Sequence, residues 1–327
     1  MAEHEQPTEA RDPDDGGDRG RHASKPTEVP ARGWLDVARR VKDEAKTDQV
    51  PLLAAGVAFF GLLALIPALV ALLSLYGLVA DPEDIRRQVD DALAAAPAEV
   101  RELIGQQLTS IQSSSDGGAL IAVLAGALVA LWSASSGMSH LIDAINTAYD
   151  EEESRGFVRR RGLSLLLTLG AIGFVVFALG GIAVVPAVAE SANLGVVGSV
   201  LVQVVRWVVL FGGLLAGLAV LYRWAPDRDA PRWSWSSPGA IAAAVGWLVV
   251  SMLFSFYVSN FGSYNETYGS LGAIVVVMMW LYLSALVVVL GAELNTELER
   301  QTEHDTTEGR AQPRGHREAY AADTVAR

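Results

Sequence analysis

Long apolar segments alternate with short polar segments along most of this chain. No acidic or basic residue lies between Asp48 and Asp81, and five more apolar segments follow before Glu293. A helix rises about 1.5 Å per residue, so roughly 20 apolar residues cross a hydrocarbon core about 30 Å thick. Backbone groups inside a bilayer must bond to one another, because no water reaches them. The pattern therefore predicts an all-α polytopic membrane protein with six transmembrane helices, at about residues 52–80, 119–142, 163–189, 196–222, 238–259 and 269–292.

A polar segment with helical periodicity separates the first two predicted spans. Apolar residues recur every three to four positions between residues 82 and 112, and Pro97 divides the segment in two. This spacing predicts an extracytoplasmic pair of amphipathic helices. Basic residues are scarce there, which favours a cap on the rim of the bundle over a helix lying on the lipid surface. Binding of a partner by this pair stays open.

The two ends of the chain differ in composition from its centre. Residues 1–30 and 301–327 are rich in polar and charged residues and contain few large apolar ones. Segments of this composition cannot bury enough apolar surface to fold alone. We therefore predict disordered cytoplasmic tails at 1–30 and 301–327, on either side of one membrane domain at 31–300.

The distribution of lysine and arginine predicts the orientation of the chain. Basic residues near span ends are retained in the cytoplasm whatever the net charge, which here is −12. They cluster before the first span, between spans two and three, between spans four and five, and after span six. Both termini are therefore expected in the cytoplasm. The chain contains no cysteine, which excludes disulfides, thiolate nucleophiles and cysteine metal sites.

Polar residues form one stripe on the second predicted span. Their spacing of three and four residues places them on one helix face, with Asn146 beside them and Leu141 on the other side. Ionisable residues at membrane depth usually point into the bundle or a wet cavity and mark a pathway. The alternative is that the helix leaves the membrane at His140 and Asp143. No metal site is expected, because these two residues alone do not complete a coordination shell. The candidate polar pathway comprises Ser133, Ser136, His140, Asp143, Asn146 and Thr147.

Arg206 is a second charged outlier within an apolar segment. About 24 Å of helix separates it from Arg223, so one of these guanidinium groups must lie near the hydrocarbon boundary or inside the bundle. Snorkelling of the side chain to the outer headgroups is one interpretation. Arg206 is otherwise a candidate contact for a lipid headgroup or another anion, because a partly desolvated arginine forms bidentate bonds to phosphate.

A polar break separates the last two predicted spans. Glycine and asparagine permit a tight or partly re-entrant turn, and tyrosines favour the membrane interface. A plain outer turn with an aromatic belt is the simpler interpretation. The candidate helix-break residues are Tyr264, Asn265, Glu266, Tyr268, Gly269 and Gly272.

Four sequence segments resemble the YihY/BrkB family of bacterial inner-membrane proteins, formerly labelled ribonuclease BN. They are AAGVAFFGLLALIPALVALLSLYG, LWSASSGMSHLIDAINTAYD followed by RRRG, LYRWAPDRDAPRWSWSSPGA, and YGSLGAIVVVMMWLYLSALVVVLGAELNTEL. The resemblance covers roughly residues 34–300 and implies six spans and a multi-pass location in the plasma (inner) membrane. The family has no firmly assigned chemistry. This chain has Phe59 and Phe60 where tyrosines are expected, which argues against a role for hydroxyl groups there.

The sequence does not support the former nuclease label. RNA hydrolysis needs metal ligands or general acid and base groups on a soluble, basic surface. Four of the five histidines lie in the predicted tails, and no Ser/His/Asp arrangement, Walker loop or histidine-rich metal motif occurs. We therefore predict that the protein is not an enzyme and has no cofactor, no bound metal and no nucleic-acid partner.

Two non-enzymatic functions remain. The polar stripe, Arg206 and the polar break favour a translocator of lipid, another amphipathic molecule or a small solute. The alternative is a membrane scaffold or envelope-assembly protein without transport activity, in which the polar residues only satisfy one another. The lipid bilayer is the expected partner in both cases, and homo-oligomerisation stays open.

Overall fold

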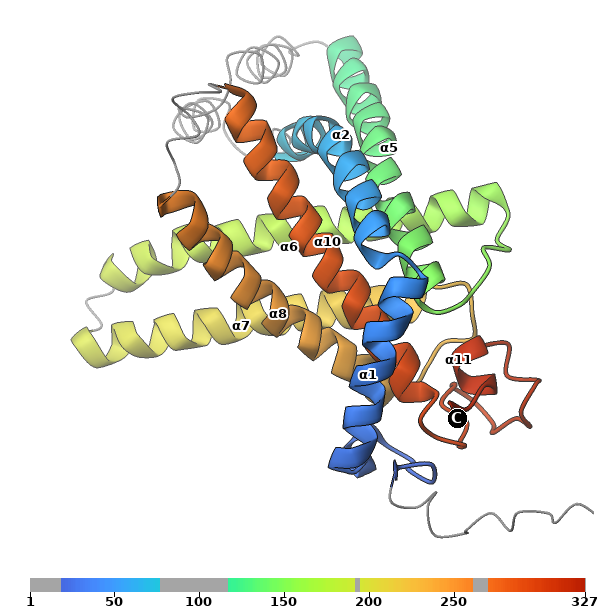
Figure 1. Ribbon diagram of the computed structural model, residues 1–327. Helices are drawn as coiled ribbons and strands as arrows, with labels where there is room; N and C mark the ends of the chain where they lie inside the picture. The colour runs from blue at the N-terminus through green and yellow to red at the C-terminus, as the bar shows by residue number, and fades with distance from the viewer. Residues whose placement is uncertain (1–18, 77–116, 192–194, 261–269, 327) are drawn as a thin grey trace, which may run out of the picture.

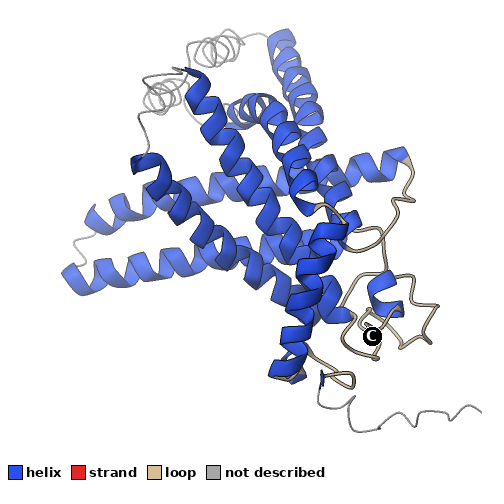
Figure 2. Ribbon diagram, in the orientation of Figure 1, coloured by secondary structure: helices blue, strands red, loops and turns tan. Residues whose placement is uncertain are grey.

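Helices joined by loops make up the described part of the protein (Figure 2). The computed structural model describes four stretches of the chain, residues 19–76, 117–191, 195–260 and 270–326. No strand occurs among these residues, and one isolated antiparallel bridge joins Pro231 to Thr307. The all-α prediction is therefore confirmed. The amphipathic pair predicted at 82–112 lies outside the described residues.

Long helices occupy the apolar segments of the described chain. They are α2 (Val50–Tyr76), α5 (Gly117–Ala148), α6 (Phe157–Ser191), α7 (Gly195–Trp224), α8 (Trp233–Asn260) and α10 (Ser270–Glu299). Four of them, α6, α7, α8 and α10, contain stretches of 26 to 28 residues that are long and apolar enough to cross a membrane. The helix α1 (Ala31–Thr47) meets α2 at a bend of 63°, and this pair would make a fifth span. The described residues thus contain four or five candidate spans, and the predicted count of six remains a proposal.

Two helices continue well past the C-terminal bounds predicted from the sequence. The second predicted span ended at residue 142 and the sixth at residue 292, whereas α5 continues to Ala148 and α10 to Glu299. Both extensions are polar, and hydropathy alone ends a span where polar residues begin. The extensions remain helical because their side chains find partners within the protein, as the contacts of Asn146 and Asn295 below demonstrate.

The helices α2, α5 and α10 form the centre of the bundle (Figure 1). α2 packs along α5, and α10 contacts α2, α5 and α8. α6 and α7 form an antiparallel pair that runs across the other helices in the view of Figure 1. Where these helices meet, the buried core contains Ile142, Ile145, Tyr222, Val289 and several alanines. Small residues at the crossings allow the helix backbones to approach closely.

The N-terminal segment and α1 pack against the end of α10. The chain turns from α1 into α2 at Gln49, whose φ is +52°. Val37 of α1 lies in a small apolar cluster with Trp235 and Leu298, and Arg40 forms an ion pair with the buried Glu297. Residues 19–30 also belong to this packed end, so the predicted disorder is corrected there.

Residues 301–326 fold onto the same end of the bundle, and the predicted disorder is wrong for them. They include the short helix α11 (Tyr320–Asp323), and Thr302 is buried. Hydrogen bonds rather than apolar burial define their path. The Asp305 carboxylate, for example, accepts a 2.8 Å hydrogen bond from the backbone N–H of Gln312. Composition misses such a segment because its buried polar groups are satisfied internally.

Candidate functional site

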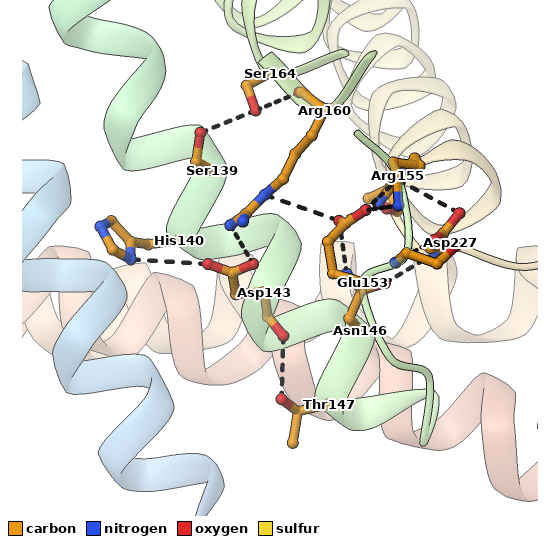
Figure 3. Close-up of polar contacts among 12 residues, drawn as sticks. Ser139, His140, Asp143, Asn146, Thr147, Glu153, Arg155, Arg160, Ser164 and Asp227 are labelled. Atoms are coloured by element: carbon orange, nitrogen blue, oxygen red, sulfur yellow. Dashed lines mark hydrogen bonds and ion pairs between the residues drawn. The ribbon is translucent and has the colours of Figure 1, made fainter. Parts of the chain in front are cut away.

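The two ionisable residues of the polar stripe contact two different helices. The Asp143 carboxylate accepts a 2.5 Å hydrogen bond from Arg160 on α6 (Figure 3). The ring of His140 stacks on Phe60 of α2, with centroids 3.5 Å apart and planes inclined by 15°. His140 Nδ1 lies 4.0 Å from Asp143 Oδ2, and the two side chains are 38% and 42% exposed. Asp143 therefore lies between an imidazole and a guanidinium group, and all three side chains are partly exposed.

Hydroxyl groups extend the contact between α5 and α6. Ser139 Oγ donates to Ser164 Oγ at 2.9 Å, and Ser164 Oγ donates to the Arg160 carbonyl at 3.0 Å (Figure 3). Thr147 acts locally, because its hydroxyl donates to the Asp143 carbonyl one turn earlier at 3.1 Å. Ser133 and Ser136, the remaining residues of the stripe, are half-buried. They take no part in these hydrogen bonds.

Asn146 joins two loops that are distant in sequence. Its Nδ2 donates to Glu153 at 3.1 Å, and its Oδ1 accepts a hydrogen bond from the Asp227 backbone N–H at 2.8 Å (Figure 3). Arg155 lies between the same carboxylates, 2.7 Å from Glu153 and 3.5 Å from Asp227. Burial would raise the pKa of Asp227, but hydrogen bonds from Ser154 and the charge of Arg155 lower it. The loops after α5 and α7 are thus fixed to the end of α5.

Asn295 of α10 connects three elements at the buried end of the bundle. Its Oδ1 accepts a 2.7 Å hydrogen bond from the Gly239 backbone N–H, and its Nδ2 donates to the Tyr149 hydroxyl and the Ser236 carbonyl at 3.2 Å. The Thr296 hydroxyl donates to the last carbonyl of α5 at 2.8 Å. Asn295 and Thr296 are not among the residues predicted from the sequence, because the predicted span ends before them. The sequence signal that could have identified them is the run of polar residues with which α10 continues past its apolar segment.

A buried ion pair joins the loop after α7 to the end of α10. Arg228 Nη2 lies 2.7 Å from Glu299 Oε2, and neither side chain has exposed surface. Thr306 donates a 2.6 Å hydrogen bond to the same carboxylate. Burial would lower the pKa of Arg228, but the neighbouring Glu299 charge more than offsets this and raises it. Arg228 therefore stays charged. Burial also raises the pKa of the adjacent Tyr149 hydroxyl.

An apolar cavity of about 410 Å³ lies between α2, α5, α6 and α10. Thr168 of α6 and Ser284 of α10 contribute its polar side chains. No residue of the stripe lines it. The α5 residues that do are Ala134, Gly137, Met138 and Leu141. The cavity and the stripe therefore occupy neighbouring faces of α5.

Arg206 contacts protein groups and does not join the stripe. Its Nη1 donates to the Ile182 carbonyl on α6 at 3.2 Å, and its guanidinium lies 5.2 Å from the Trp207 ring. These contacts hold the side chain between α6 and α7. A headgroup contact at Arg206 remains a prediction.

Most of the candidate helix-break residues lie outside the described part of the chain. Of the candidate break residues, Gly272 is buried in α10, whereas the residues from 264 to 269 lie outside the described part.

Among the described residues, no group of three or more histidine and carboxylate side chains is arranged to hold a metal ion.

Comparisons with known proteins agree with the resemblance seen in the sequence. A family model described as virulence factor BrkB matches residues 41–315. The ribonuclease-like protein YfkH of Bacillus subtilis is 35% identical over 258 residues, which cover 76% of this chain and 90% of YfkH. A UPF0761 membrane protein of Tolumonas auensis is 35% identical over 113 residues, 35% of this chain and 36% of that protein. No solved structure matches the chain.

The family match includes every long helix described above and both loops that Asn146 joins. The relatives named as membrane proteins agree with the apolar helices of the structure. This chain is therefore a membrane protein that belongs to the virulence factor BrkB family.

Proposed function

We propose that this protein binds a lipid or another amphipathic molecule within the membrane and moves it across the bilayer. The supporting observation is an apolar cavity beside ionisable side chains. Gly137 and Leu141 line the cavity, and His140 lies between them in the sequence. Phe60, which stacks on His140, directly precedes the cavity residue Gly61. An amphipathic molecule needs this combination, with room for its apolar part and charged groups within a turn of helix.

Arg160 is the group in this region best suited to a phosphate headgroup. Arginine binds phosphate through parallel hydrogen bonds. Its Nη2 pairs with Asp143, its Nε lies 3.9 Å from Glu153, and its side chain is 34% exposed. A headgroup that displaced Asp143 from Arg160 would leave that carboxylate beside His140, 4.0 Å away.

A scaffold without transport is the second candidate, and one observation favours it. Asn146, Glu153, Arg155 and Asp227 use their polar groups on one another across two loops. A network satisfied in this way fixes a structure and leaves few groups for a substrate. In a scaffold, His140 and the other residues of the stripe would likewise fix the structure and bind no substrate.

We also propose six spans in the plasma membrane with both termini in the cytoplasm. Contacts between Ser154 and Asp227, and between Arg228 and Glu299, bring the loops after α5 and α7 to the end of α10. These loops and the C-terminal segment carry many of the basic residues, which favours the cytoplasmic side for this end.

Reconstitution in proteoliposomes, with lipid-scrambling and solute-flux assays, tests the proposed function. We expect wild-type protein to accelerate lipid exchange between leaflets. Ala171→Phe adds bulk to a residue that lines the cavity and should abolish this activity, whereas Leu169→Phe, on the same helix outside the lining, should retain it.

Two outcomes would contradict the proposal. One is wild-type protein that moves neither lipid nor solute, while His140→Ala and Asp143→Asn lose stability, as a scaffold predicts. The other is equal lipid exchange by Ala171→Phe and wild type, which would separate any transport from this cavity.

A further inference from the structure

Three carboxyl groups meet where the ends of α1, α5 and α10 come together. Glu293 on α10 has 1% of its surface exposed, and its Oε1 has no hydrogen-bond partner in the described chain. The Asp48 carboxyl, at the corner between α1 and α2, contacts the Glu293 side chain closely enough for a hydrogen bond. Asp150, two residues after the end of α5, interacts electrostatically with both. Glu293 is therefore a deeply buried acid that contacts Asp48 and interacts with the charge of Asp150.

No arginine or lysine of the described residues forms an ion pair with Asp48, Asp150 or Glu293. Arg40 and Arg300, which contact this end of α10, form ion pairs with other carboxylates. Arg300 pairs with Glu44 at 3.2 Å and with Glu297 at 2.5 Å. The helices α2 and α8, which also pack against α10, carry no acidic or basic residue. The other titratable or charged groups of the described residues that face the three acids are Glu44, Tyr149, Glu151, Glu297 and Arg300.

A bound proton would remove the repulsion between these carboxylates and supply the missing donor hydrogen. Two ionised carboxylates cannot hydrogen-bond to each other, because neither carries a donor hydrogen. Adjacent carboxyl groups in a poorly solvated site instead keep one of them protonated. Burial raises the pKa of Asp48, and burial followed by the charge of Asp48 raises the pKa of Asp150 to about 6. The environment thus disfavours three negative charges at this point.

We propose that Asp48 and Glu293 form a proton-binding site in which Glu293 carries the shared proton at neutral pH. Its hydrogen bond to Asp48 holds the corner between α1 and α2 against α10. Loss of the proton would place two negative charges in contact and weaken the attachment of that corner. The inference does not depend on whether the protein transports lipid.

Infrared difference spectroscopy of the full-length protein in nanodiscs, recorded as a function of pH, tests the site. Protonated carboxyl groups give a distinct C=O stretching band, and labelling glutamate with ¹³C separates glutamate from aspartate. We expect a protonated glutamate at neutral pH in wild type and in Asp43→Asn, which removes an exposed carboxylate of α1. The band should be lost in Glu293→Gln.

Asp48→Asn supplies a second readout that does not require Glu293→Gln to fold. It removes the neighbouring negative charge, so the band should disappear at a lower pH than in wild type. An unchanged midpoint would overturn the proposal, as would a band that persists in Glu293→Gln. The absence of a protonated glutamate from wild type at neutral pH would overturn it without any variant.

Discussion

The imidazole ring of His140 lies nearly parallel to the ring of Phe60, with centroids 3.5 Å apart. This contact joins α5 to α2 beside the apolar cavity. Phenylalanine at this position departs from the tyrosine expected from the family resemblance. The departure does not remove the contact with the stripe, because stacking uses the ring face and needs no hydroxyl group.

Loss of this stacking should destabilise the protein. We expect Phe60→Leu to lower the free energy of unfolding by about 0.5 to 1.5 kcal/mol, the usual range for an aromatic pair. Phe59→Leu, at a more exposed neighbouring position, is the matched control and should cost less. Thermal unfolding in detergent measures both, and equal losses would show that the His140 contact contributes nothing.

Removing one partner of the buried pair between Arg228 and Glu299 should destabilise the protein far more than removing one partner of an exposed pair. Glu299→Gln leaves the guanidinium buried without its countercharge, which typically costs about 3 to 5 kcal/mol. Lys46→Gln breaks an exposed pair with Asp43, and an effect below about 1 kcal/mol is expected there. Chemical unfolding of both variants measures the difference. Similar stabilities would mean that solvent reaches Arg228.

Gly239 allows α8 to approach α10. A Cβ atom there would collide with the Gly291 carbonyl and lie 2.6 Å from the Asn295 side chain. Gly239→Ala should therefore cost about 1 to 3 kcal/mol or prevent folding. Gly212→Ala on α7 meets open space and should be neutral or slightly stabilising. Detergent-solubilised yield and thermal unfolding of the two variants compare these effects, and equal behaviour would contradict the close crossing.

The helical architecture could be predicted from the sequence, because apolar length alone specifies a membrane helix. The stripe on α5 was also visible, since its spacing follows the helical period. The partners of the stripe were not visible. Arg160 lies 17 residues from Asp143, and Asp227 lies 81 residues from Asn146. Contacts over such separations depend on how the helices pack, which periodicity does not encode.

The polar ends of the helices were the main source of error. Asn295 and Thr296 follow the last apolar run, so hydropathy assigned them to the exit from the membrane. Buried hydrogen bonds instead keep them inside the bundle. Residues 301–326 were missed for the same reason, because Asp305 and other polar groups define their path. Hydropathy measures transfer from water and cannot anticipate polar groups that find internal partners.

Asp150 should make stability depend on pH. Burial, and then the charge of Asp48, raise its pKa from 3.8 to about 6. A carboxyl group with a higher pKa in the folded state favours folding at low pH, and this contribution is lost as the pH rises through about 6. Asp150→Asn removes the charge and suits the positive φ of +54°.

We therefore expect Asp150→Asn to unfold at a higher temperature than wild type at pH 7, and the difference to vanish below the unfolded-state pKa of 3.8. The gain should stay below about 1 kcal/mol, because Asp150 is only partly buried and solvent screens its charge. Thermal unfolding across this pH range provides the measurement. A difference that is constant with pH would point to backbone conformation instead.

The proposed topology can be tested cleanly because the chain has no native cysteine. Arg159 and Arg310 are exposed on the end of the bundle assigned to the cytoplasm, whereas Arg228 is buried and unsuitable. A membrane-impermeant maleimide should therefore label Arg159→Cys and Arg310→Cys only after the cells are permeabilised. Gln88→Cys, in the segment predicted outside, should react in intact cells and confirms that the reagent works. Labelling of Arg159→Cys in intact cells would reverse the orientation, because basic residues near span ends would then lie on the outer side.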